Sequence, residues 1–306
     1  MKRKVIKLGP STHVISLPSK WITKNNIKQG KELEVYEAEN HLLIKQPVGQ
    51  GRSTRITLED ESKKNIYIAL SHAYRMGFDK IKVKFQDPDT IKKISRVTEE
   101  NLLGFEVTKK EENSCQLENI TEPTSKKFEV LLRRIFLQIK ETQKLVKEDF
   151  ETNKKENQTE MKEIRISLDR YIFFCRRCIT KGVETEKQNV LLWELLTFLM
   201  HIHHNYYYLY DFYADNQKQK VNNKTVKILE DLEDYFDRYY KAYFENKSSY
   251  LTQKVMHHNQ LHRTILTELS NNKNNDNVLL AYLKEIAHLI QVGSSPIRAI
   301  LAKEEN

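Results

Sequence analysis

Proline is absent from the chain between Pro123 and Pro296, and that long stretch holds only two glycines, Gly182 and Gly293. Proline and glycine are the residues that interrupt helices most strongly. Their scarcity predicts that the second part of the chain consists of long helices. Five of the six prolines and six of the eight glycines lie at or before Pro123, so shorter elements and more turns are expected in the first part.

Long apolar runs are also lacking. No run approaches the roughly 18 apolar residues of a membrane span, and the longest, 191–200, is interrupted by Glu194. No membrane insertion is therefore expected. The basic start is not followed by the apolar segment of a secretory signal. The three cysteines lack the spacing of a disulfide framework, which favours a cytoplasmic location.

Motifs for chemistry are equally scarce. The chain has no glycine-rich phosphate loop and no strong catalytic motif, so neither an enzyme nor a cofactor is expected. Cys175 and Cys178 form a Cys-x-x-Cys pair, but redox pairs of this kind usually lie at a helix N-terminus. This pair falls inside a predicted helix, and a structural role is favoured over a redox role.

Acidic residues are missing from the start of the chain, where the first carboxylate is Glu32. The net charge of the whole chain is +9. A basic surface of this kind, doubled by dimerisation, would attract the phosphate backbone of DNA. The alternative is a solvated basic surface of the sort common on soluble proteins. The cations before Glu32 include Lys2, Arg3, Lys4, Lys7, Lys20, Lys24 and Lys28.

The first 46 residues have the pattern of short strands joined by turns. Cations alternate with aliphatic residues in 2–8, and alternation resumes in 13–17 after a Gly-Pro-Ser turn, which predicts two strands. A short helix is expected at 18–24, ended by Asn25 and Asn26, and two further strands are expected around 33–36 and 42–44. Four short strands offer too little core for a monomer, so two copies are expected to interleave.

Several spaced segments of residues 1–47 together form a family pattern. They are Lys4-Val5-Ile6-Lys7-Leu8-Gly9, Ser11, Val14-Ile15-Ser16-Leu17-Pro18, Lys20-Trp21, Ile27, Gly30, Leu33-Glu34-Val35-Tyr36 and Leu42-Leu43-Ile44. This pattern resembles the SpoVT/AbrB family, which implies a homodimeric swapped-hairpin β-barrel that binds double-stranded DNA. The resemblance assigns DNA contacts to Lys4, Lys7, Ser11 and His13. The charge pattern adds Lys2, Arg3, Lys20 and Lys24.

Residues 48–120 predict a small α+β unit. Strands are expected at 55–58, 80–85, 105–107 and 114–117, and helices at 59–76 and 89–98. We assign this unit to connection and packing, with a binding role as the alternative.

Residues 121–306 predict a helical domain of six helices, at 125–152, 160–181, 185–215, 224–244, 249–269 and 277–303. Segments 199–204 and 283–288 share a leucine, an isoleucine and a histidine at equal offsets. Each lies in the third helix of a triplet, which suggests a duplicated three-helix repeat. The tyrosines of the last four helices have the spacing of core residues, and most are expected to pack.

Five segments of the later chain carry a second resemblance. They are Tyr74–Ile81, Leu103–Val107, Leu168-Asp169-Arg170-Tyr171, Ile202–His204 and Glu285-Ile286-Ala287-His288. They are similar to the PhoU family, particularly to archaeal members with an N-terminal AbrB-type domain. This resemblance implies a PhoU-like sensing or partner-binding domain and a link to phosphate uptake and homeostasis. Some relatives bind metal clusters through acidic motifs on paired helices.

The acidic motifs of those relatives are altered here. Asp169 matches, but His204 and His288 stand where the family carries acids, and Tyr208 and Val292 fill the later polar positions. No multinuclear metal site is therefore expected. Asp169, His204 and His288 remain candidates for a mononuclear site, because imidazole suits zinc, copper or nickel. Structural histidines are the favoured alternative.

Together these patterns predict a cytoplasmic, homodimeric, DNA-binding transcriptional regulator of α+β class. The alternative is a PhoU-like adaptor that regulates phosphate transport through contacts with a transport or signalling protein, without binding DNA.

Overall fold

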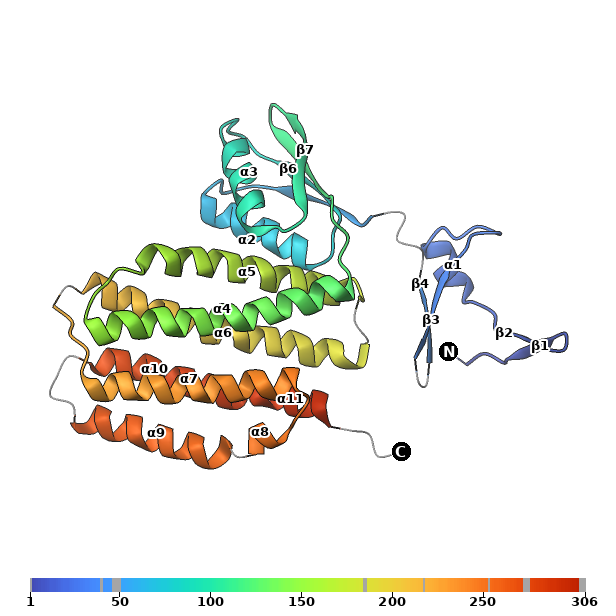
Figure 1. Cartoon of the computed structure of the whole chain (residues 1–306). Coiled ribbons are helices and arrows are strands. Elements are labelled where there is room, and N and C mark those ends of the chain that lie inside the picture. The colour runs from blue at the N-terminus through green and yellow to red at the C-terminus, as the bar shows by residue number, and fades with distance from the viewer. Residues whose placement is uncertain are drawn as a thin grey trace. The chain divides into compact units, whose positions relative to one another are not determined.

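The computed structural model describes residues 2–38, 41–45, 51–183, 186–216, 218–252, 254–271 and 276–302. The chain divides into two compact units, residues 1–51 and residues 52–306, here called the N-terminal and C-terminal units (Figure 1). Small sheets and long helices together place the fold in the α+β class, as predicted.

The N-terminal unit contains two antiparallel hairpins and one short helix. Its elements are β1 (Ile6–Leu8), β2 (Thr12–Val14), α1 (Ser19–Lys24), β3 (Glu34–Ala38) and β4 (His41–Lys45). β1 pairs only with β2, and β3 only with β4, so the described part of a single chain contains no closed barrel. The order of elements is the predicted one, although β2 ends at Val14, three residues before the predicted end.

The helix α1 ends at the predicted asparagines. Asn26 has a φ of 49°, in the left-handed region. The Ile27 amide donates to the carbonyl of Ile22 at 3.1 Å, and the Asn26 amide donates to the carbonyl of Thr23 at 3.2 Å. This pair of hydrogen bonds is a Schellman motif, which asparagine tolerates better than most residues.

The C-terminal unit begins with a four-stranded sheet and two helices. The sheet order is β5-β6-β8-β7, with β5 parallel to β6 and the other pairs antiparallel. Buried side chains such as Ile81, Val83 and Leu117 cover one face of the sheet, and α2 and α3 in turn contact α5 (Figure 1). The elements are β5 (Ser53–Thr57), α2 (Lys63–Arg75), β6 (Lys80–Lys84), α3 (Thr90–Asn101), β7 (Phe105–Glu111) and β8 (Ser114–Asn119).

The helical part forms two groups of three long helices. In one group α4, α5 and α6 contact one another, and in the other α7, α9 and α10 do so. The groups meet where α4 packs against α7 and α6 against α10. This grouping agrees with the expected two sets of three helices. The helices are α4 (Ser125–Thr152), α5 (Gln158–Thr180), α6 (Glu186–Asp215), α7 (Asn223–Phe244), α8 (Ser249–Thr252), α9 (Lys254–Asn271), α10 (Asn277–Val292) and α11 (Ser294–Leu301).

The last predicted helix, 277–303, is two helices in the structure, because the chain bends at Gly293. Pro296 has no amide hydrogen to donate to the carbonyl of Val292. At the same bend, the hydroxyl of Tyr239 donates to the carbonyl of Gly293 at 2.7 Å. A Cβ on Gly293 would lie 2.9 Å from the Cβ of Phe198, so close packing requires glycine at the bend.

Aromatic side chains fill the core between the helix groups. The ring of Phe136, on α4, is the centre of this cluster, and its exposed fraction is 0%. Five rings of α7 lie with centroids 5.3–6.0 Å from it, so the expected packing role holds for these tyrosines. They belong to Phe236, Tyr239, Tyr240, Tyr243 and Phe244.

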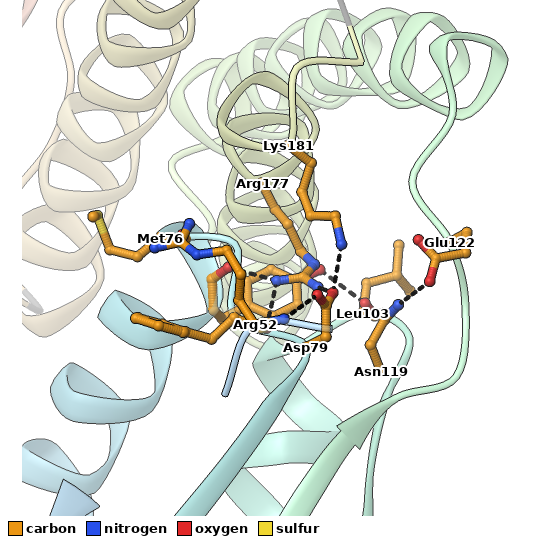
Figure 2. Close-up of polar contacts among 10 residues, drawn as sticks. Arg52, Met76, Asp79, Leu103, Asn119, Glu122, Arg177 and Lys181 are labelled. Atoms are coloured by element: carbon orange, nitrogen blue, oxygen red, sulfur yellow. Dashed lines mark hydrogen bonds and ion pairs between the residues drawn. The ribbon is translucent and has the colours of Figure 1, made fainter. Parts of the chain in front are cut away.

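A buried arginine joins the helices to the sheet (Figure 2). The side chain of Arg177, on α5, is fully buried and donates to the carbonyls of Tyr74 at 3.0 Å and Phe78 at 2.7 Å. It also pairs with the Oδ1 atom of Asp79 at 2.5 Å, and Lys181 reaches the same oxygen at 2.7 Å. These contacts connect α5 directly to the start of β6, so residues 52–306 form one compact unit.

Candidate DNA-binding surface

The β1–β2 hairpin has one apolar face and one polar face. Ile6 lies opposite Val14 and Lys7 lies opposite His13. Because neighbouring side chains on a strand point to opposite faces, Ile6, Leu8 and Val14 share one face while Lys7 and His13 share the other. A shift of one residue in register would mix the two sets.

The turn of this hairpin contains Ser11. Gly9 has a φ of 82°, and a Cβ built on it would meet no atom within 4 Å. The backbone conformation therefore favours glycine at this position, and space does not require it. Ser11 follows in the same turn, one residue before β2 begins.

The other predicted DNA-binding residues flank the hairpin in sequence. Lys2, Arg3 and Lys4 precede β1, and Lys20 and Lys24 lie four residues apart on α1, so on one side of that helix. The eight predicted residues share two properties: each is exposed, and none forms an ion pair with another described residue. They are Lys2, Arg3, Lys4, Lys7, Ser11, His13, Lys20 and Lys24.

This arrangement can bind a nucleic-acid backbone. Unpaired ammonium groups are free to neutralise phosphates and release counterions, which is the main source of affinity for DNA. Ser11 and His13 supply further hydrogen-bonding groups beside the cations, and such groups contact phosphate oxygens or base edges. A two-stranded ribbon is narrow enough for the major groove.

The apolar residues of the N-terminal unit have no interior within one chain. Leu8 is 63% exposed, Val35 is 58% exposed and Leu42 is 60% exposed. No side chain described in this unit is buried. Exposed apolar surface of this kind marks a contact with another molecule or another copy.

Comparisons with known proteins give no match. No family model, no curated protein and no solved structure is similar to the chain at a significant level. Function must therefore be argued from the residues. Among the described helices, none has the length and apolar character needed to cross a bilayer.

The structure brings together two of the three metal candidates. The Nε2 atom of His204, on α6, lies 2.8 Å from the Oδ1 atom of Asp169, on α5. His288 is exposed on α10. Across the described ranges no group of three histidine, cysteine or acidic side chains is placed to hold a metal, whereas zinc normally takes three or four protein ligands.

His203 is the most unusual histidine of the helices. Its ring is completely buried, and neither ring nitrogen has a hydrogen-bond partner among the described residues. Burial, with smaller contributions from the charges of His204 and Arg165, holds the pKa of His203 well below its ordinary value of 6.5. The imidazole is therefore neutral at physiological pH.

Two features of α5 bear on the sequence predictions. Cys175 and Cys178 are buried and are not joined in a disulfide, and they lie more than fifteen residues after the helix begins at Gln158. Sequence reasoning missed the structural role of Arg177. The available signal was the adjacent pair Arg176 and Arg177 inside an apolar run, a position where arginine requires buried partners.

Proposed function

We propose that the chain is a homodimeric, DNA-binding transcriptional regulator. The observation that supports this most directly is the hairpin with Lys7 and His13 on one face and exposed aliphatic side chains on the other. The polar face suits a phosphate backbone. The apolar face suits a second copy of the chain, because pairing would bury it.

The proposed dimer is a swapped-hairpin barrel of the SpoVT/AbrB kind. Four strands of three to five residues cannot enclose a core alone. Two copies would supply eight strands and would cover the exposed side chains of Leu8, Val35 and Leu42. Dimerisation would also double the number of basic groups that face the DNA, which raises affinity without new contact types.

The helices of the C-terminal unit would regulate this binding. Binding of a ligand or protein partner to the helices would alter affinity for DNA, or the spacing at which the dimer binds. The link to phosphate uptake and homeostasis, and the PhoU-like character of the helices, rest on the resemblance of segments such as 168–171 and 285–288. The proposal includes no catalytic step, and a DNA-binding regulator belongs in the cytoplasm.

Fluorescence anisotropy of labelled duplexes in a salt series tests the proposal. Genomic fragments, including the promoter of the protein's own gene, are compared for the wild type and for Lys4→Glu/Lys7→Glu. If a dimer neutralises roughly six phosphates, affinity should fall about a thousandfold between 50 and 200 mM salt. The double variant should bind every sequence more weakly and with a smaller salt slope.

A matched control carries the same charge change on the C-terminal unit. Lys64, on α2, and Lys162, on α5, are exposed and have no ion pair with a described residue. Lys64→Glu/Lys162→Glu should retain most of the wild-type affinity. Wild-type binding at low salt that is no tighter than that of Lys4→Glu/Lys7→Glu would remove the DNA-binding proposal.

The adaptor is the second candidate, and one observation favours it. An apolar hollow of about 600 Å³ lies beside the end of α5 and the start of α6, and includes Ile179, Val190, Trp193 and Phe198. A protein that acts through contacts with a transport or signalling partner needs such a surface. If no DNA binding is found in the anisotropy series, the adaptor is the remaining candidate.

A further inference from the structure

The outer face of the C-terminal sheet is polar and basic. On β6 the side chains of Ile81 and Val83 are buried against the helices, so the alternating Lys80, Lys82 and Lys84 point outward. The same alternation applies to β5 and β8, and on β7 it shifts by one residue at an irregularity between Val107 and Lys109. The remaining outward residues are Ser53, Arg55 and Thr57 on β5, Glu106, Lys109 and Glu111 on β7, and Ser114, Gln116 and Glu118 on β8.

Charge is unevenly distributed over this face. The strands β5 and β6 contain no acidic residue, and the acids all belong to β7 and β8. Lys80 pairs with Glu118 at 2.5 Å, and Lys109 pairs with Glu111 at 2.7 Å. The other three cations, Arg55, Lys82 and Lys84, form no ion pair with any residue that the structure describes.

The strand register brings two of these unpaired cations together. Arg55 is the cross-strand partner of Lys82, and Lys82 is in turn the partner of Gln116. Adjacent strands lie about 4.8 Å apart, and like charges directly opposite each other destabilise a sheet. The charge of Lys82 is offset only in part, by Glu111, whose pKa it helps to lower, and an anion placed over the two cations would relieve the remaining repulsion.

The surface around the pair is shallow and mostly basic. A hollow of about 160 Å³ is lined by the cations Arg55, Lys82, Lys84 and Lys109 and by one carboxylate, Glu111. Glu111 accepts from the hydroxyl of Ser114 at 2.6 Å and pairs with Lys109, so its charge is already engaged. Ligand pockets usually measure about 300–1,000 Å³, so this hollow suits a single phosphate group better than a cofactor. A neighbouring hollow also includes Arg55, Lys82 and Gln116, so the basic surface continues along β5 and β6.

The face has no apolar anchor. None of the large hydrophobic residues that are exposed in the C-terminal unit belongs to the outward set of this sheet. Single-stranded nucleic acid is usually held by exposed aromatic rings, and membrane-surface binding requires buried apolar side chains. Cations with neutral donors and without aromatic rings instead fit the backbone of a duplex.

We propose that this face, centred on Arg55, Lys82 and Lys84, binds the phosphate backbone of double-stranded DNA without reading its sequence. The inference rests on the proposed DNA-binding function of the N-terminal unit. Ser53, at the start of β5, follows Lys45, at the end of β4, by only eight positions. A short connection of this kind gives the second surface a high effective concentration once the first has bound.

The test compares three forms of the full-length protein by fluorescence anisotropy in a salt series. The variant Arg55→Gln/Lys82→Gln/Lys84→Gln removes the three unpaired cations. The control Lys126→Gln/Arg134→Gln/Lys162→Gln removes one arginine and two lysines from exposed positions on α4 and α5. The first variant should lower the logarithmic salt slope by about 0.9 for each phosphate that it no longer neutralises, so by up to about 2.7 for each chain of the dimer.

That reduction should be the same for promoter fragments and for unrelated duplexes, because backbone contacts carry no sequence information. The control should retain the wild-type slope, and the unfolding midpoint reported by Trp193 should show that both triple variants are folded. A wild type that binds no DNA would remove the proposed function itself. A wild type that binds DNA, with an unchanged slope in the Arg55/Lys82/Lys84 variant, would overturn only this inference.

Polyglutamate provides the remaining arm of the test. If the face binds acidic protein segments, labelled polyglutamate should bind the wild type and not the Arg55/Lys82/Lys84 variant, while the DNA slope stays the same in both. That result would overturn the assignment to DNA. Weak polyglutamate binding together with a reduced DNA slope would support it.

Discussion

The two units of this chain differ in how far their apolar side chains are buried. In the N-terminal unit Ile6, Leu8 and Val35 are each more than half exposed, and no described side chain is buried. In the C-terminal unit a continuous set of buried side chains runs from Leu58, under the sheet, to Ile297, on α11. The units are nonetheless parts of one chain, whose hydrophobic content is 39%.

The difference indicates two sources of stability. The C-terminal unit can bury its apolar surface within one chain, so its unfolding should not depend on protein concentration. The N-terminal unit cannot, so we expect its stability to come from association and to rise with concentration. The chain has two tryptophans, Trp21 in the N-terminal unit and Trp193 in the C-terminal unit. In the variant Trp193→Phe the remaining Trp21 reports on the N-terminal unit, and in Trp21→Phe the remaining Trp193 reports on the C-terminal unit.

The largest expected effect is on the C-terminal unit, from Arg177→Met. Loss of the guanidinium removes the side-chain donor of the Phe78 carbonyl and one of the donors of the Tyr74 carbonyl, which keeps the amide of Gly77. It also leaves Asp79 with a weaker set of partners. Removing one partner of a buried ion pair typically costs 3–5 kcal/mol. Urea unfolding followed by Trp193 should show a loss of about that size, while the Trp21 signal should change little.

Arg96→Met is the matched control. Arg96 pairs with Glu100 on the surface of α3, and exposed pairs four residues apart in a helix contribute about 0.3–0.5 kcal/mol. Equal losses for Arg96→Met and Arg177→Met would contradict the proposed role of Arg177 in joining α5 to the sheet.

The second effect concerns the N-terminal unit. If Leu8 is buried between two copies, Leu8→Ala should weaken the dimer by about 2 kcal/mol for each chain. The Trp21 unfolding midpoint should rise with protein concentration in the wild type and be lower at every concentration in the variant. Val130→Ala is the control, because Val130 is 61% exposed on α4, and it should leave both reporters unchanged. A Trp21 midpoint independent of concentration would contradict association.

The sequence predicted the repetitive features of the fold well. The scarcity of proline and glycine after Pro123 located the long helices, and the alternation in 80–84 located β6 and its two faces. Both signals repeat over many residues, so single exceptions do not hide them. The break at Gly293 was missed because the contacts of this glycine with Tyr239 and Phe198 join segments far apart along the chain.

The candidate surfaces were predictable in part. Four of the eight residues of the N-terminal surface were selected from charge and four from the family resemblance, but the opposition of Lys7 and His13 depends on register, which the turn fixes. The like-charge pair of Arg55 and Lys82 comes from strands separated along the chain by α2. No local pattern indicates such a pairing. The unit containing it was therefore assigned to connection and packing, with a binding role only as the alternative, whereas the structure provides grounds for that binding role.

The third prediction is a pH dependence confined to the C-terminal unit. The pKa of His203 is depressed in the folded state, so the unfolded chain binds the proton more readily. The contribution of neutral His203 to the stability of the fold is therefore fully present above about pH 6.5 and is lost as the pH falls below that value. The free energy of unfolding reported by Trp193 should fall by up to about 1.4 kcal/mol per pH unit from this one group.

His203→Leu should remove this dependence, because leucine fills the site without a titrating nitrogen. It should not lower stability at pH 7.5, because both ring nitrogens of His203 already lack partners among the described residues. His288→Gln, at an exposed position on α10, is the control and should keep the wild-type pH profile. An unchanged profile in His203→Leu would assign the acid sensitivity to other groups.

The smallest effect separates packing from backbone strain in the two units. Gly9 and Gly104 have nearly the same φ, 82° and 80°, so alanine at either position meets the roughly 1 kcal/mol cost of the left-handed region. A Cβ on Gly104 would lie 2.8 Å from the Cβ of Thr121, whereas one on Gly9 would meet nothing within 4 Å. Gly104→Ala should therefore lower the free energy of unfolding more than Gly9→Ala does, as followed by Trp193 and Trp21 respectively.

The double variant Gly104→Ala/Thr121→Ser tests the cause, because it removes the Cγ of Thr121 and keeps the hydroxyl. Since the nearest clash is with the Cβ that serine retains, this double variant should recover only a small part of the loss, and full recovery would show that the segment around Thr121 is loosely held.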